Sequence, residues 1–190
     1  MEPWVWWAIG GGAVVLFVLF VIVTYNGLVS RKVETDNAWS QISVQLQRRH
    51  DLIPNLVETV KGYAKHEQQT LEKVIQARNQ AVSAGSIAEK GAAESMLTSA
   101  VRGLLAIAEA YPDLKANQNF LALQEELTAT ENRIGFARQH YNDTAAQYNE
   151  ALMRFPANTV AGLFNFRAAD FFALDPAQAE AVKQVPKVQF

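Results

Sequence analysis

The stretch that decides the architecture extends from Pro3 to Ser30 and reads PWVWWAIGGGAVVLFVLFVIVTYNGLVS, without one charged side chain. An α-helix rises about 1.5 Å per residue, so about 20 apolar residues cross a hydrocarbon core of about 30 Å. Aromatic rings crowd its start and recur near its end, as they do where a span meets the membrane interfaces. Residues 1–30 are therefore predicted to form a single transmembrane anchor. Its predicted membrane contacts are Trp4, Trp6, Trp7, Leu16, Phe17, Leu19, Phe20 and Tyr25.

The same stretch lacks the features of a cleaved signal peptide. The only early charge is Glu2, the apolar core exceeds the roughly 7–15 residues of a signal, and Val23–Asn26 is a poor cleavage site. Arg31 and Lys32 are the first basic residues after the span, and no lysine or arginine precedes it. The positive-inside rule therefore predicts an external amino terminus and a cytoplasmic main domain.

Length, charge and cysteine content limit the kinds of domain and binding site that residues 31–190 can form. Subtracting the 30 anchor residues from 190 leaves 160, which suits one ordinary domain. The net charge of −2 gives no electrostatic reason to bind nucleic acid. Because the chain has no cysteine, disulfides and thiolate metal sites are excluded.

Apolar residues recur every seven positions from about Lys32 to Ala84, which predicts one long helix with a packing seam. Arg49 and Glu67 interrupt that seam. Either a buried polar residue sets the register there, or the bundle is locally open. Pro54 lacks the amide hydrogen of a helix interior and favours a kinked continuous helix over a restart. The seam residues predicted to pack are Trp39, Leu46, Ile53 and Val60.

Two further helices are predicted after Gly85. Ser86 and Glu89 have the spacing of a capping box, which starts a helix that extends to about Ala110. A third helix begins near Asn117 or Asn119, either of which can cap it, and its large residues recur every seven positions, a pattern that suits antiparallel packing. These residues are Phe120, Leu127, Ile134, Tyr141, Tyr148 and Phe155. The predicted fold is all-α: the anchor, then a long antiparallel helical bundle over residues 31–156.

Residues 157–190 lose this register and are predicted to form a short irregular C-terminal tail. Its four phenylalanines between positions 164 and 172 are too apolar to lie in water, so they fold back over the bundle or contact the bilayer or a partner. The final residues either dock as an added strand on a partner or pack on their own bundle. The candidate contacts for a partner or a second copy are Phe171, Phe172, Val188 and Phe190.

No recognisable catalytic motif is present. The residues three before His50, His66 and His140 are not acidic, so the Glu-x-x-His pairs of di-iron bundles are missing. The metalloprotease pattern that starts at His66 fails at its second histidine. His50 and Asp51 are adjacent and point to different faces of a helix, which predicts two separate surface contacts. The sequence therefore predicts a protein that is not an enzyme and has no metal or other cofactor.

The order of these motifs resembles the LemA family. The resemblance rests on Trp39–Ile42, Gln47–Val57, Lys61–Ala64, Tyr111–Asn117, Leu123–Leu127, Glu131–Ile134, Tyr141–Asn142, Arg154–Pro156 and Pro186–Val188. It implies a single-pass protein of the bacterial inner membrane whose helical bundle faces the cytoplasm. It supplies no catalytic residues, because the family has no established enzymatic activity. Relatives are linked with membrane and organelle-membrane assembly, and they often occur beside membrane metalloproteases.

These features predict a membrane-anchored, non-enzymatic helical scaffold that self-associates and organises partners at the membrane surface. Its predicted partners are the bilayer, further copies of the chain, and a membrane protease or other membrane protein, but not nucleic acid. The alternative is an adaptor for membrane proteolysis or protein quality control. That role predicts co-purification with a protease or its clients, and a monomer or small oligomer.

Overall fold

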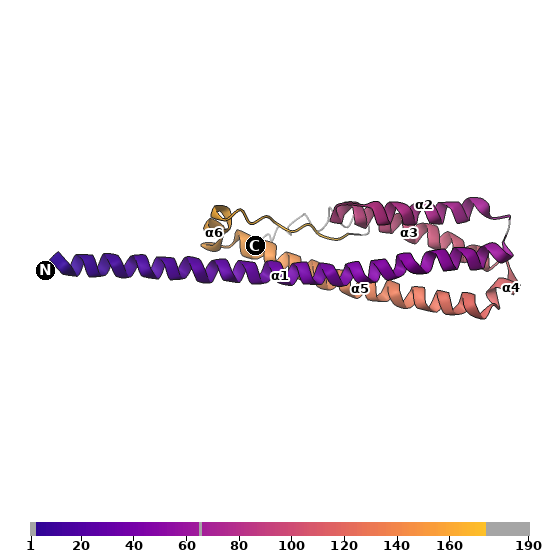
Figure 1. Ribbon diagram of the computed structural model, residues 1–190, viewed down its shortest axis with the longest axis horizontal. Helices are drawn as coiled ribbons and strands as arrows, with labels where there is room; N and C mark the ends of the chain where they lie inside the picture. Colours follow the sequence, from indigo (N-terminus) through magenta and orange to yellow (C-terminus); the bar gives the residue numbers. More distant parts are fainter. Residues whose placement is uncertain (1–2, 65, 174–190) are drawn as a thin grey trace, which may run out of the picture. The chain divides into compact units, whose positions relative to one another are not determined.

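A computed structural model describes residues 3–64 and 66–173, and every regular element in this part of the chain is an α-helix (Figure 1). The helices are α1 (Pro3–Tyr63), α2 (Gln68–Ser83), α3 (Ile87–Ala108), α4 (Pro112–Lys115), α5 (Gln118–Met153) and α6 (Ala157–Leu163). The all-helical prediction is confirmed. The described chain forms two compact units, a first unit of residues 3–38 with 143–169 and a second of residues 39–142 with 170–173. The predicted boundaries at residues 30 and 156 stay a prediction.

In the first unit, α1 carries a long apolar surface that the protein itself does not cover. It is the one helix of the described residues that is long and apolar enough to cross a membrane. Among the side chains that the structure describes in this part of α1, the first fully buried one is Leu28, which is 3% exposed. The predicted anchor side chains Trp4, Trp7, Leu16, Phe17, Leu19, Phe20 and Tyr25 are all exposed, and the side chain of Trp6 lies outside the described ones.

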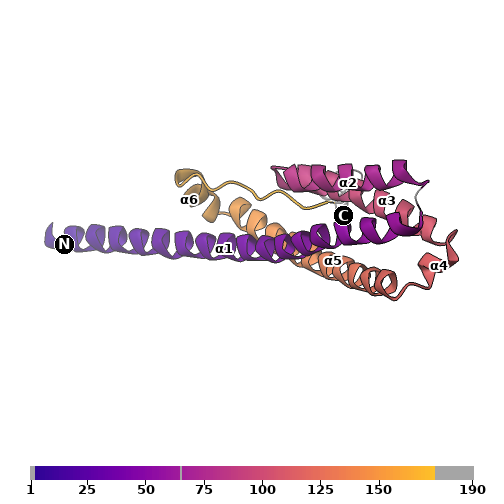
Figure 2. The same ribbon diagram turned by 45° about the vertical axis from the view of Figure 1, so that its right-hand side comes forward.

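The second unit is a bundle of helical segments around one apolar core. α2 and α3 follow one another through a short turn and lie side by side in Figures 1 and 2. They pack with the second half of α1 and the first part of α5. Core residues from all four elements include Ile53, Val60, Val74, Leu97, Leu104, Phe120 and Leu127. Burying a side chain of this size contributes about 1.5–3 kcal/mol, so this core is the main source of the bundle's stability.

The prediction of one helix from Lys32 to Ala84 was wrong beyond Tyr63. α1 is continuous through Pro54, as predicted, but it ends at Tyr63, and α2 begins at Gln68. The polar interruption at Glu67 lies in the turn between them. A seven-residue repeat did not reveal this turn, because two helices that face the same core continue the same apolar pattern as one helix would.

The helix ends follow their local sequence. At the start of α3, Ser86 Oγ accepts from the Glu89 amide at 3.2 Å, and Glu89 Oε2 accepts from the Ser86 amide at 2.9 Å. This confirms the predicted capping box. Asn117 caps α5 by accepting from the Phe120 amide at 3.0 Å. α5 ends at Met153, so Phe155 lies beyond the helix.

Candidate functional site

Arg49 is the centre of a buried polar cluster in the second unit. Its guanidinium donates to Glu94 Oε2 at 3.1 Å, to Thr98 Oγ1 at 2.8 Å and to Glu131 Oε1 at 3.2 Å. The Arg49 and Glu94 side chains are 2% and 1% exposed, whereas Glu131 is 41% exposed. Of the two alternatives left open by the sequence, the structure therefore shows the buried polar residue.

Glu94 uses both of its carboxylate oxygens. Oε2 accepts from Arg49, and Oε1 lies 2.6 Å from His50 Nε2. His50 is 5% exposed, so the prediction of a surface contact at this histidine was wrong. Its neighbour Asp51 is exposed and accepts from Gln47 at 2.8 Å, so the two adjacent residues do face different surroundings. One carboxylate on α3 therefore joins two consecutive residues of α1.

Two further contacts tie this cluster to the surrounding helices. Arg78 of α2 donates from Nε to the His50 carbonyl at 2.9 Å. Thr98 donates to the Glu94 carbonyl at 2.9 Å while it accepts from Arg49. Polar groups of α1, α2, α3 and α5 thus contact one another in the second unit, and these hydrogen bonds favour the register of the helices in which they form.

The chemistry of this cluster suits packing rather than turnover. Glu94 is 1% exposed and its two oxygens are engaged, so a substrate has no access to this carboxylate. Among the described residues, no group of three or more histidine and acidic side chains is arranged to hold a metal ion. The arrangement can hold helices in register and couple them to one another.

A second constellation attaches the segment 170–173 to the bundle. The Trp39 ring contacts the tilted ring of Tyr141 with centroids 5.4 Å apart and the edge-on ring of Phe172 at 5.5 Å. Tyr141 donates its hydroxyl hydrogen to the Asp170 carbonyl at 2.6 Å. Asn142 donates to the Phe172 carbonyl at 3.1 Å and accepts from the Phe172 amide at 2.9 Å. The asparagine therefore satisfies both backbone groups of Phe172, as a neighbouring strand would.

The close approach of this segment to α3 explains a glycine. A Cβ added at Gly91 would lie 2.1 Å from the Ala173 carbonyl oxygen. Gly103 on the same helix has nothing within 4 Å of such an atom. Only a residue without a side chain lets the extended segment lie against α3 at this point.

The predicted packing residues differ in where the structure places them. Most are buried: Leu46, Ile53, Val60, Phe120, Leu127, Ile134, Tyr141 and Tyr148. Trp39 is half-buried. Phe155 is 85% exposed, so the prediction that it packs with the other large residues of this repeat was wrong. α5 ends at Met153, so Phe155 no longer lies on the helix face that carries Phe120 and Tyr148. In the first unit, burial raises the pKa of Tyr148.

The predicted contact tail also needs correction. Phe172 is fully buried against Trp39, so it is not available to a partner and follows the fold-back alternative instead. Phe171 is half-buried. Val188 and Phe190 lie outside the described residues.

Sequence reasoning missed Glu94, although a signal was present. Glu94 lies seven residues before Val101 and fourteen before Ala108, on the apolar stripe of α3. A carboxylate on one stripe and Arg49 on another are complementary charges at positions that both face the core. Considering Arg49 and Glu94 together would have indicated a buried ion pair.

Comparison with known proteins gives the family of this chain. The model of the LemA family matches residues 38–190, which includes the whole of the second unit. The chain belongs to the LemA family. This confirms the resemblance seen in the motifs. Together with the apolar α1, it makes this LemA family protein a membrane-associated helical protein.

Two kinds of relative illustrate the family. Magnetosome protein MamQ 2 of Paramagnetospirillum magneticum is 26% identical over 191 residues, covering 87% of this chain and 70% of the relative. Protein LemA of Metamycoplasma hominis is 28% identical over 182 residues, covering 86% of this chain and 83% of the relative. Neither name states a catalytic activity.

Proposed function

We propose that this LemA family protein is a membrane-anchored, non-enzymatic scaffold that self-associates and organises partners at the cytoplasmic face of a bacterial inner membrane. The observation that carries the proposal is an uncovered apolar surface on the bundle. Val44 of α1 is 64% exposed and Phe136 of α5 is 76% exposed. Both line one groove of the second unit, together with Gln41, Gln45, Arg133, Ala137 and His140.

A second copy of the chain is the occupant that this surface suits. Large exposed apolar side chains flanked by polar ones mark contact surfaces on soluble domains. Confinement of α1 to a bilayer raises the effective concentration of neighbouring copies, so a small lateral contact suffices for assembly. The relatives named for the magnetosome support a role in a larger assembly.

The cytoplasmic orientation rests on charge. Arg31 and Lys32 follow the apolar part of α1 directly and are both exposed. Lysine is charged at neutral pH at its ordinary pKa. The hydrogen bond that Lys32 donates to Asp36 at 2.7 Å raises the pKa of Lys32 further. Basic residues that flank a span are retained on the cytoplasmic side.

The test is the mass of the full-length protein in nanodiscs, measured by light scattering. We expect a homogeneous multiple of 21.1 kDa for the natural chain and a smaller mass for Phe136→Glu. Leu121→Glu is the matched control, because Leu121 lies on the same helix and is 47% exposed but is not part of this groove. A monomer for the natural chain, or equal masses for both variants, would contradict the proposal. A monomer that captures a membrane protease would favour the adaptor role instead.

A further inference from the structure

The first unit contains an aromatic contact at the end of the apolar stretch of α1. The Tyr25 ring lies with its centroid 4.8 Å from that of Phe164 and 5.6 Å from that of Phe166. Both phenylalanines follow α6, which lies beside α1 in Figures 1 and 2. Tilted and edge-on ring pairs at these separations are favourable contacts, so they hold the end of α6 against α1.

The position of Tyr25 along α1 gives the depth of this contact in a membrane. Tyr25 follows Trp7 by 18 residues, which is about 27 Å along a helix axis. A hydrocarbon core is about 30 Å thick, and tryptophan and tyrosine side chains prefer its two boundaries. With Trp7 at one boundary, Tyr25 lies at the other. Phe164 and Phe166, which touch its ring, then lie at the same level.

The end of α6 is built to place both rings there. Asn165 has a φ of 56°, the left-handed conformation that closes many helices. The Phe166 amide donates to the Ala161 carbonyl at 3.0 Å, and the Asn165 amide donates to the Gly162 carbonyl at 3.4 Å. These two bonds form a Schellman motif, which reverses the chain so that the residues on either side of Asn165 can contact one ring.

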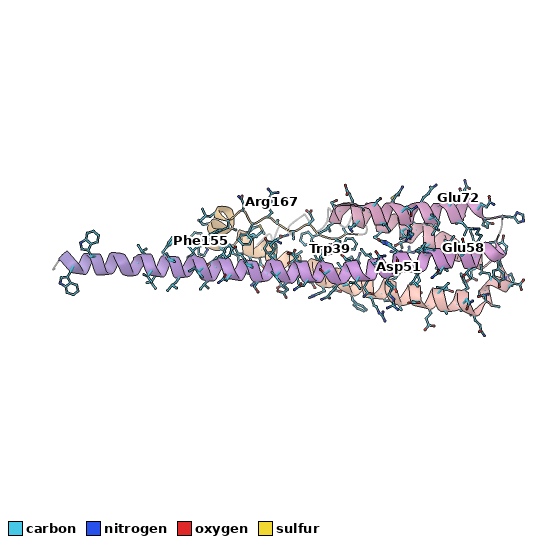
Figure 3. The ribbon with its side chains drawn as sticks, viewed as in Figure 1. Trp39, Asp51, Glu58, Glu72, Phe155 and Arg167 are labelled. Carbon is cyan, nitrogen blue, oxygen red and sulfur yellow. The ribbon has the colours of Figure 1, made fainter. Side chains whose placement is uncertain are left out.

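The outer side of α6 remains uncovered and apolar. Val160 and Ala161 are buried, but three nearby apolar side chains are exposed. We call Phe155, Leu163 and Phe164 the α6 apolar surface; they are 85%, 75% and 47% exposed. Figure 3 shows Phe155 at the corner between α5 and α6. Such a surface is unfavourable in water and favourable at the boundary of the hydrocarbon core.

Charge around this surface suits lipid headgroups. Residues 151–169 contain Arg154 and Arg167 and no acidic side chain, but Arg154 donates at 2.6 Å to Glu150, which directly precedes this stretch. Arg167 is exposed, as is Arg31 on α1 within the same unit. Basic side chains beside an apolar surface are attracted to anionic headgroups.

We propose that the α6 apolar surface inserts into the interfacial region of the leaflet where α1 leaves the bilayer, as a second membrane contact of this chain. The inference rests on the membrane-anchored part of the proposed function and not on self-association. Its occupant is the lipid surface, because the aromatic contact at Tyr25 makes the α6 apolar surface continuous with the membrane-spanning surface of α1.

The test uses full-length protein in nanodiscs of phosphatidylcholine and phosphatidylglycerol. The chain has no cysteine, so a single introduced cysteine carries an environment-sensitive fluorophore without background labelling. The variants are Leu163→Cys on the α6 apolar surface, Val15→Cys in the span, and Ala146→Cys as an exposed control on α5 of the same unit. Nitroxide lipids carry the quencher either near the headgroup or deep in the acyl chain.

We expect the Leu163 probe to lose fluorescence with the shallow quencher, the Val15 probe with the deep one, and the Ala146 probe with neither. A Leu163 probe as unquenched as that at Ala146, beside a deeply quenched Val15 probe, would overturn the inference and leave the anchor intact. A blue-shifted but unquenched Leu163 probe would also overturn it, because protein then covers the surface. An unquenched Val15 probe would remove the anchor and the inference together.

Discussion

The substitution Glu94→Gln tests whether the buried cluster holds the bundle together. It keeps the size of the side chain but removes the charge that faces Arg49 and His50. Arg49 would remain 2% exposed with Glu131 as its only carboxylate partner within the described residues, and that partner is 41% exposed. Removing one member of a buried ion pair costs about 3–5 kcal/mol. Because Glu131 and Thr98 remain, we expect about 3 kcal/mol.

The assay is thermal unfolding of the full-length protein in detergent, followed by far-ultraviolet circular dichroism. For a chain of this size, about 3 kcal/mol corresponds to a fall in Tm of about 6–12 °C. Glu131→Gln is the matched control, because an exposed partner contributes at most about 1 kcal/mol. If Glu94→Gln lowered Tm no more than Glu131→Gln, the buried pair would not be a stabilising contact. Adding Arg49→Met to Glu94→Gln should recover part of the loss, because the unpaired charge is then absent.

Three further predictions test other contacts, two of them with a matched control substitution. Gly91→Ala should destabilise by about 1–3 kcal/mol because its Cβ would clash with the Ala173 carbonyl, whereas Gly103→Ala should be neutral or stabilising by up to about 1 kcal/mol; both are measured by thermal unfolding. Phe172→Ala should cost about 3–5 kcal/mol and Phe155→Ala close to nothing in denaturant titrations, and equal effects would refute the burial of Phe172. The amides of Ser86 and Gly85 donate to the Glu89 carboxylate and lower the pKa of Glu89 below its ordinary value of 4.5. The charged carboxylate therefore stabilises α3 above about pH 4.5, and this contribution disappears as the pH falls through the lowered pKa. Acid titration of Tm should show a difference between the natural chain and Glu89→Gln that shrinks as the pH falls through this range, and a constant difference would contradict the assignment.

Much of the helical architecture could be predicted because its signals are local. The uncharged run from Pro3 to Ser30 predicts the apolar first part of α1 by length and polarity alone. Ser86 and Glu89 are three residues apart, and their capping bonds form within one helical turn. The repeat from Phe120 to Tyr148 lies on one helix, so its spacing was enough to predict which side chains face the core.

Of the ion pair at the centre of the candidate site, the sequence indicated only one member. Arg49 was recognisable as an exception on an apolar seam. Its partner Glu94 lies 45 residues away, on another helix. Periodicity identifies which face of each helix is apolar. It does not tell which polar residue on the apolar face of one helix contacts which polar residue on another helix. That pairing depends on the register in which the helices pack.

What the sequence by itself determined is therefore local: the apolar span, the helix start at Ser86, and the apolar faces of the helices. These depend on interactions within a few residues, where side-chain type and spacing decide the outcome. Only the tertiary structure decided that the chain turns back after Tyr63, that Glu94 bridges Arg49 and His50, and that Gly91 admits the segment ending at Ala173. Each of these features needs contacts between residues of different elements that are far apart in the sequence. Such contacts contribute to the free energy of folding only once the helices have packed.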